Sequence, residues 1–195
     1  RTRAILLCNP NNPTGSIYSR EVLESLCKLA QKNSLIIILD EVYKNMIYTE
    51  SEIYTPCADE SFKKCIIRVV SFSKDFSLTG WRVGFLHADK ELIQQILPVH
   101  DALINCVPVI SQYAALAAIE NADRILRQNK KIYHKHMMLM KKYLDTLSDH
   151  LRYVMPEGAY YFFPRFTKSV DVKKFCLALL QNESVAVVPG NDFGS

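Results

Sequence analysis

Three short polar segments carry side chains that could do chemistry together, and each directly follows an apolar run. Residues 9–15 read Asn-Pro-Asn-Asn-Pro-Thr-Gly, residues 40–43 read Asp-Glu-Val-Tyr, and residues 71–74 read Ser-Phe-Ser-Lys, with Arg82 shortly beyond. Together they supply an amide, a carboxylate, a phenol, hydroxyls, an amine and a guanidinium. Such a set can bind an anion and transfer a proton. Each segment alone is equally explained by a turn, a helix cap or a solvated lysine, so an active site requires that the segments meet.

The elements predicted around these segments would bring them together. Three apolar runs are predicted strands: residues 4–8, 35–39 and 65–70. The run of branched residues at 35–39 is typical of a strand buried in a parallel sheet. Asn12, Asp40 and Lys74 are about 30 residues apart, the length of one βαβ unit. Because ligands bind outside the carboxyl ends of parallel strands, the spacing predicts a site at one edge of the sheet.

The remaining elements follow from periodicity and connection length. A fourth strand over 82–87 follows the third too soon for a parallel crossover, so we expect it to run antiparallel. One predicted helix spans 19–33, with Ser19 as its N-cap and a buried stripe of Val22, Leu23, Leu26 and Leu29. Further helices are expected over 89–104, where Pro98 could bend or break the helix, over 109–121, and in a long basic stretch beyond 122. A smaller α+β unit should follow, with strands over 152–155, 159–163 and 185–188 and a helix over 170–182.

Composition narrows the class of protein. The 195 residues are 49% hydrophobic and 23% charged, which is ordinary for a globular protein and unlike a disordered one. The longest unbroken hydrophobic stretch, residues 113–119, is too short to span a bilayer, and no signal peptide opens the chain. We therefore expect a cytoplasmic protein without a membrane partner.

Cysteine and charge patterns exclude two further classes of site. The six cysteines are scattered without C-x-x-C spacing, which predicts a reducing compartment and no metal site. Basic residues concentrate between 124 and 152, where Ile125, Ile132 and Leu139 recur at helical spacing. This pattern favours the solvated side of an amphipathic helix over a nucleic-acid interface.

At several ordered motifs the sequence resembles a known family. Residues 9–15, 40–43 and 71–84, together with Pro-Glu-Gly-Ala-Tyr-Tyr at 156–161, are similar to the class I/II aminotransferases. These are fold-type I enzymes that depend on pyridoxal 5′-phosphate (PLP). The likeness covers essentially the whole chain and corresponds to the C-terminal half of such an enzyme.

The resemblance implies roles for three catalytic residues. Lys74 would form the Schiff base with PLP and then carry a proton, which requires a neutral amine and therefore a lowered pKa. Asp40 would pair with the pyridinium nitrogen and keep the ring an electron sink. Tyr43 would donate a hydrogen bond to the phenolic oxygen of the cofactor.

The same resemblance implies further cofactor-binding residues. Asn12 would join Tyr43 at the phenolic oxygen, while Ser71 and Arg82 would hold the phosphate through charge-assisted contacts. The aromatic run at 160–163 is expected to fill the core of the small domain, although one ring could face the substrate.

The resemblance also implies a fold, a domain division and partners. It implies a three-layer α/β/α, mostly parallel sheet, as in an incomplete PLP-binding large domain, over 1–125. An interdomain helix and part of a smaller α+β C-terminal domain would occupy 126–195. The expected activity is transamination between an L-amino acid and a 2-oxo acid by a homodimer. The family's glycine-containing phosphate loop and substrate-binding arginine are not found in these 195 residues, so we expect the chain alone to be inactive.

Two other functions fit the same motifs. A PLP-dependent C–S β-lyase or an aminocyclopropanecarboxylate-synthase-like lyase would use the same lysine and aspartate, because both reactions begin by removing the α-proton. A non-catalytic regulatory domain could retain the fold and the cofactor. The segment over 78–84 is more similar to transaminases than to either lyase group.

Overall fold

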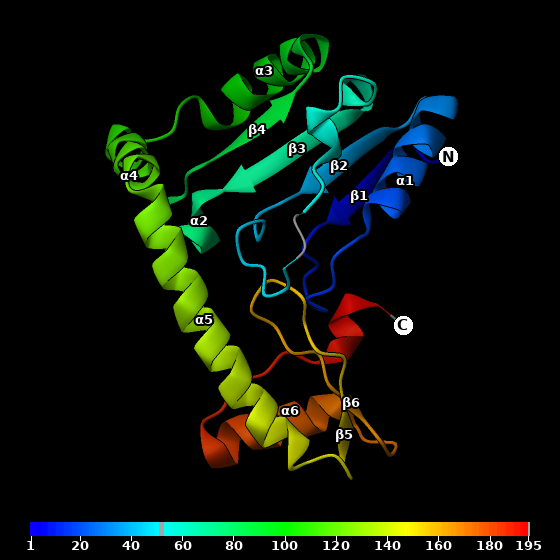
Figure 1. Ribbon diagram of the computed structural model, residues 1–195, viewed down its shortest axis with the longest axis vertical. Helices are drawn as coiled ribbons and strands as arrows, with labels where there is room; N and C mark the ends of the chain where they lie inside the picture. Colours follow the sequence, from blue (N-terminus) through cyan, green and yellow to red (C-terminus); the bar gives the residue numbers. More distant parts are fainter. Residues whose placement is uncertain (51–52, 195) are drawn as a thin grey trace.

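A four-stranded sheet forms the body of the computed structural model, which describes residues 1–50 and 53–194 (Figure 1). Its strands lie in the order β1 (Ala4–Cys8), β2 (Ile36–Asp40), β3 (Ile66–Ser71) and β4 (Gly84–Ala88). The first three are parallel and β4 is antiparallel to β3, which confirms the expectation from the short connection. That connection contains only the one-turn helix α2 (Phe72–Asp75) and the 3₁₀ turn η3 (Thr79–Trp81).

Helix α1 (Arg20–Lys32) covers the parallel strands. The Ser19 hydroxyl accepts a hydrogen bond from the Val22 amide, as predicted for the N-cap. The buried stripe, however, consists of Leu23, Cys27 and Ala30, while Val22 and Leu29 are exposed. The prediction is confirmed for Leu23, which is buried, and for Leu26, which packs against the core. It is wrong for Val22 and Leu29, because the helix turns its small Cys27 and Ala30 side chains toward the sheet. Cys27 and Ala30 pack there on a core that includes Ile37, Leu39 and Ile66.

Three further helices connect the sheet to the rest of the chain. Helix α3 (Lys90–Ile104) continues through Pro98, and α4 (Val109–Glu120) follows it. Two short 3₁₀ turns, η1 (Pro56–Ala58) and η2 (Lys63–Cys65), precede β3. Helix α5 (Ala122–Asp145) is the long basic helix and extends from the sheet to a smaller unit (Figure 1).

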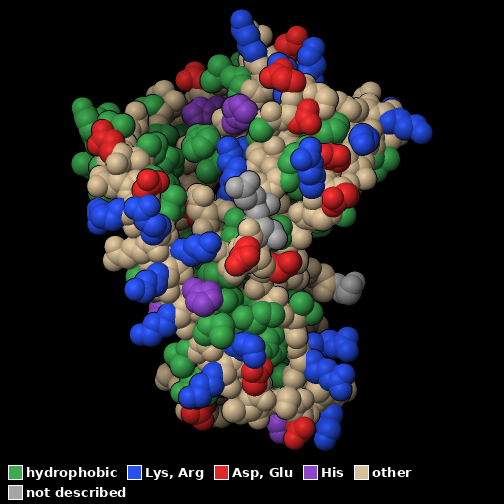
Figure 2. Space-filling model, in the orientation of Figure 1, with side chains coloured by type: hydrophobic (Ala, Val, Ile, Leu, Met, Phe, Trp, Pro, Cys, Tyr) green, Lys and Arg blue, Asp and Glu red, His purple; other side chains and the backbone are tan. Residues whose placement is uncertain are grey.

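The apolar residues that α5 buries differ from the predicted ones. Met137 and Leu144 are buried, whereas Ile132 and Leu139 are exposed. The helix contacts the body through only a narrow strip, so most of its apolar residues stay accessible in the described part of the chain. Lys and Arg side chains lie along its outer side (Figure 2), as the charge pattern predicts. None of the helices in residues 1–50 and 53–194 is both long and apolar enough to cross a membrane.

The smaller unit contains helix α6 (Val172–Glu183), the 3₁₀ turn η4 (Gly190–Phe193) and a two-stranded ladder of β5 (Leu151–Arg152) and β6 (Arg165–Phe166). Two of the three strands expected here do not form, since residues 159–163 and 185–188 are not strands. The third, expected over 152–155, is reduced to β5, which shares only Arg152 with it. For residues 159–163 the reason is a competing set of partners. Residues 157–159 hydrogen-bond to loops of the sheet body instead of to a strand of their own unit. The predicted domain boundary between residues 125 and 126 stays a prediction. Ser195, the last residue of the expected second domain, lies outside the described residues.

Candidate active site

One edge of the sheet collects the polar segments singled out in the sequence. The carboxyl ends of β1, β2 and β3 lie at this edge because the three strands are parallel. Strand β4 runs the other way, so its amino end lies there too, and Ser71 pairs directly with Gly84. The reversal brings Arg82 to the edge that carries Asp40 and Ser71. The topology thus assembles the predicted residues as the spacing indicates.

Asp40 begins the turn that carries Tyr43. The carboxylate Oδ1 of Asp40 accepts a hydrogen bond of 3.0 Å from the Val42 amide, and residues 42–45 form a turn. A carboxylate that bonds its own backbone two residues on fixes such a turn without help from another element. The other oxygen, Oδ2, is not used in this contact.

Tyr43 lies at the centre of an aromatic cluster. Its ring centroid is 5.4 Å from that of Tyr160 and 5.5 Å from that of Tyr161, both in edge-to-face geometry. The hydroxyls of Tyr43 and Tyr161 share a hydrogen bond, and Asn12 Nδ2 donates to the Tyr161 oxygen at 3.3 Å. Burial raises the pKa of Tyr43, and it raises the pKa of Tyr161 to about 12. Both phenols are therefore neutral at physiological pH and able to donate.

Lys74 reaches the same cluster from helix α2. Its Nζ lies 5.8 Å from the centroid of the Tyr160 ring, within the range of a cation–π contact. Ser71 is the N-cap of this helix, and its hydroxyl accepts a hydrogen bond of 3.1 Å from the Ser73 amide. One chain of contacts therefore links Asn12, Tyr161, Tyr43, Tyr160 and Lys74.

Ser71 and Arg82 lie together on a cavity of about 520 Å³, whose other walls come mainly from apolar residues of β3, β4 and α3. Arg82 is exposed and adopts a left-handed backbone with φ of 51°. Its Nη1 donates to the Thr79 carbonyl at 3.1 Å. Because the Ser71 oxygen accepts from the Ser73 amide, its own O–H is left to donate to an anion.

Residues 160–163 were expected in the core of the small domain, with the alternative that one ring faces the substrate. In the structure, Tyr160 and Tyr161 both pack on Tyr43 at the site. The backbone explains this: the amides of Glu157 and Gly158 both donate to the Gly15 carbonyl at 2.9 Å, so the segment is tied to the first polar loop. Only this docking, which no periodicity reveals, carries the rings into the site.

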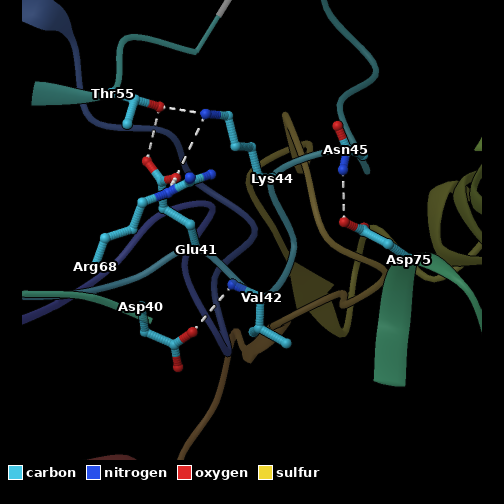
Figure 3. Close-up of polar contacts among 8 residues, drawn as sticks. All are labelled: Asp40, Glu41, Val42, Lys44, Asn45, Thr55, Arg68 and Asp75. Carbon is cyan, nitrogen blue, oxygen red and sulfur yellow. Dashed lines mark hydrogen bonds and ion pairs between the residues drawn. The ribbon is translucent and has the colours of Figure 1, made fainter. Parts of the chain in front are cut away.

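A buried carboxylate behind the edge was not predicted either. Glu41, which is 0% exposed, points away from Asp40 (Figure 3). Its oxygens accept from Arg68 Nε at 2.5 Å and Thr55 Oγ1 at 2.9 Å, and Lys44 Nζ lies 3.5 Å away. A carboxylate without solvent requires such partners, so the cluster anchors the start of the turn.

Asp75 is a second buried carboxyl, directly after Lys74. It is 2% exposed, and its Oδ2 accepts a hydrogen bond of 2.6 Å from Asn45 Nδ2 (Figure 3). Burial raises the pKa of Asp75 to about 6. Its position next to Lys74 was visible in the sequence, but nothing in the pattern indicated that the side chain is buried.

Comparison with known proteins agrees with this geometry. A family model described as "Aminotransferase class I and II" matches residues 1–195. The aspartate aminotransferase of Thermotoga maritima is 37% identical over 193 residues, which are 99% of this chain and 49% of that protein.

Solved structures give the same result. The aromatic aminotransferase of Pyrococcus horikoshii superposes with a TM-score of 0.91 at 34% identity, over 100% of this chain and 52% of that one. An aspartate aminotransferase from Thermus thermophilus with maleate gives a TM-score of 0.90 at 32% identity, over 99% and 50%. The chain spans about half the length of the curated relatives that it matches.

Proposed function

The chain belongs to the aminotransferase class I and II family, and on this basis we propose that the complete protein containing it is a PLP-dependent transaminase. It would move an amino group between an L-amino acid and a 2-oxo acid. The observation that carries the proposal is the convergence of Asn12, Tyr43 and Lys74 on one tyrosine cluster at the edge of the sheet.

The donor set at this edge fits PLP. Asp40 would hold the pyridine nitrogen, because a carboxylate favours the protonated ring. Tyr43 and Asn12 would donate to the phenolic oxygen, and the raised pKa of Tyr43 keeps its proton available. Ser71 and Arg82, which both line the cavity, would hold the phosphate. When bound, PLP supplies an aldehyde that links covalently to amines and a ring that stabilises negative charge at the neighbouring carbon.

Three residues of this chain would have separate roles in binding the cofactor and in proton transfer. Nζ of Lys74 would bind the cofactor covalently and, once displaced by the substrate amine, would accept the proton of the substrate α-carbon and deliver it to the cofactor carbon that carried the aldehyde. Tyr160, whose ring lies beside Nζ, would limit the positions open to the amine and exclude water from it. The Asp40 carboxylate would pair with the ring nitrogen, and its hydrogen bond from the Val42 amide would keep it in place.

The partners and the compartment are part of the proposal. We propose a homodimer that acts on small amino and oxo acids in the cytoplasm. The named relatives, which include aspartate and aromatic aminotransferases, support the substrate class. The six free cysteines of the chain support a reducing compartment.

The test uses the complete protein loaded with PLP. Borohydride reduction followed by peptide mapping should label Lys74, and Lys74→Ala should abolish that label. Incubation with an amino acid and a 2-oxo acid should yield the exchanged pair, and Tyr143→Phe, on an exposed face of α5, should leave the yield unchanged.

Each other outcome has its own meaning. Label on a different lysine, or none, would contradict the assignment of the site. Release of pyruvate and ammonia would replace transamination with lyase chemistry. Cofactor binding without any turnover across amino-acid substrates would favour the regulatory domain.

A further inference from the structure

The carboxyl of Asp75 connects the lysine-bearing helix to the turn that carries Tyr43. We propose that Asp75, held by Asn45, is a positioning residue that sets where Lys74 presents its amine. This inference rests on the proposed function, because it concerns the same lysine. It adds Asp75 to the residues of the proposed site, although its side chain contacts the turn at 42–45 and not the tyrosine cluster.

A side-chain contact joins the turn to the lysine-bearing helix. Asn45 is the last residue of the turn at 42–45, two positions after Tyr43. Its Nδ2 donates to Asp75 Oδ2 at 2.6 Å (Figure 3), a short bond to an acceptor that is shielded from solvent. The two ends of the bond belong to segments that each carry one proposed catalytic side chain. The distance between Tyr43 and Lys74 therefore depends on it.

Helix α2 needs such support from outside. It has four residues, far fewer than a helix requires for stability on its own. A second contact comes from α5, where Asn129 Nδ2 donates to the Asp75 carbonyl at 2.8 Å. Asp75 thus receives one hydrogen bond on its side chain from the turn and one on its backbone from the long helix. Three segments distant in sequence meet at the residue after Lys74.

Burial of this carboxyl is costly, which argues against a role in stability alone. Asp75 is 2% exposed, and its Oδ1 has no hydrogen-bond partner among the described residues. A buried acceptor without a partner costs on the order of 1–3 kcal/mol. An apolar side chain of similar size would avoid that cost, but it could not hold Asn45. Costs of this kind are found where position matters more than stability.

The experiment measures how fast PLP attaches to Lys74 in the complete protein. Cofactor-free protein is mixed with PLP, samples are reduced with borohydride at intervals, and labelled Lys74 is quantified by peptide mapping. Asp75→Ala and Asn45→Ala should each slow attachment about tenfold or more, because the amine loses its orientation. The double variant should be no slower than either single one. Asp75→Asn keeps an acceptor oxygen for Asn45 and should restore most of the rate.

Two controls separate positioning from general damage. The affinity for PLP, measured without covalent attachment in a Lys74→Ala background, should change less than about twofold on Asn45→Ala. Gln128→Ala, at the exposed neighbour of Asn129, should leave the attachment rate unchanged. Asn45 is itself exposed, so its variant tests the proposal even if Asp75→Ala does not fold.

The outcomes also separate this inference from the proposed function. Attachment at the wild-type rate in Asn45→Ala would overturn the positioning role and leave the transaminase proposal intact. Slowed attachment with an equally weakened affinity for PLP would overturn it as well, since the site as a whole would then be damaged. Absence of label in the wild-type protein would overturn both.

Discussion

At the scale of single residues, two buried carboxyl groups behave differently because their partners differ. Glu41 is surrounded by a guanidinium, an ammonium and a hydroxyl, whereas Asp75 has one amide donor. Removing one partner of a buried ion pair is strongly destabilising, because it leaves the other charge uncompensated. A buried carboxyl without a cation instead holds its proton more tightly.

Removing the cation closer to Glu41 should lower the free energy of unfolding more than removing the farther cation. Arg68→Ala leaves a fully buried carboxylate without its 2.5 Å partner and should lower the free energy of unfolding by about 3–5 kcal/mol. Lys44→Ala removes a contact of 3.5 Å whose cation is 29% exposed, so water can replace it and the loss should be about 1 kcal/mol or less. Urea unfolding of both variants tests this order, and equal losses would contradict it.

The Asp75 carboxyl should make stability fall as pH rises. Its pKa in the folded protein is about 6 against an ordinary value of 3.8, so the folded state holds a proton that the unfolded state releases. This stabilisation is complete below pH 4 and is lost as pH rises through 6, by up to about 3 kcal/mol. Asp75→Asn carries no such proton. Its stability relative to the wild-type protein should therefore increase between pH 4 and pH 7, and a constant difference would refute the assignment.

At the scale of elements, the segment over 156–161 is held to the first polar loop by backbone contacts. Two glycines permit this approach. Gly15 has a left-handed backbone with φ of 69°, and a Cβ on Gly158 would lie 2.8 Å from Pro10 Cβ and 2.9 Å from the Met46 carbonyl oxygen. The docking places Tyr161 against Tyr43, so the geometry of the site depends on a contact between elements far apart in sequence.

A side chain on Gly158 should disrupt that docking. Gly158→Ala forces the segment away from the Met46 carbonyl and should cost about 1–3 kcal/mol. It should also lower the pKa of Tyr43, since separation from Tyr161 admits water to the phenol. Ultraviolet titration of the phenols and urea unfolding measure these effects. Gly80→Ala is the matched control, because nothing lies within 4 Å of its Cβ; an equal effect there would contradict the docking argument.

At the scale of the whole molecule, the 195-residue chain leaves large apolar side chains in solvent. Leu6 on β1 is 73% exposed, Leu103 on α3 is 77% exposed and Val154 is 84% exposed. Exposed apolar surface of this extent is typical of faces that another part of an assembly covers. The matched relatives are about twice as long as this chain.

The isolated chain should therefore self-associate and show no transaminase turnover. Hydrophobic-dye fluorescence should be several-fold higher than for an equal mass of the complete protein, and size-exclusion chromatography should detect aggregates. A soluble monomer of these 195 residues with full activity would contradict the prediction and would place the whole site within this chain.

The sequence by itself determined the succession of strands and helices over residues 1–145, the antiparallel β4 and the residues that meet at the sheet edge. These follow from local periodicity and from the length of connections, and both can be read directly from the amino-acid sequence. The tertiary structure decided which face of α1 is buried, that Tyr160 and Tyr161 join Tyr43, and that Glu41 and Asp75 lie out of solvent. Burial and docking depend on what packs against a residue from a distant segment, and no local pattern contains that information.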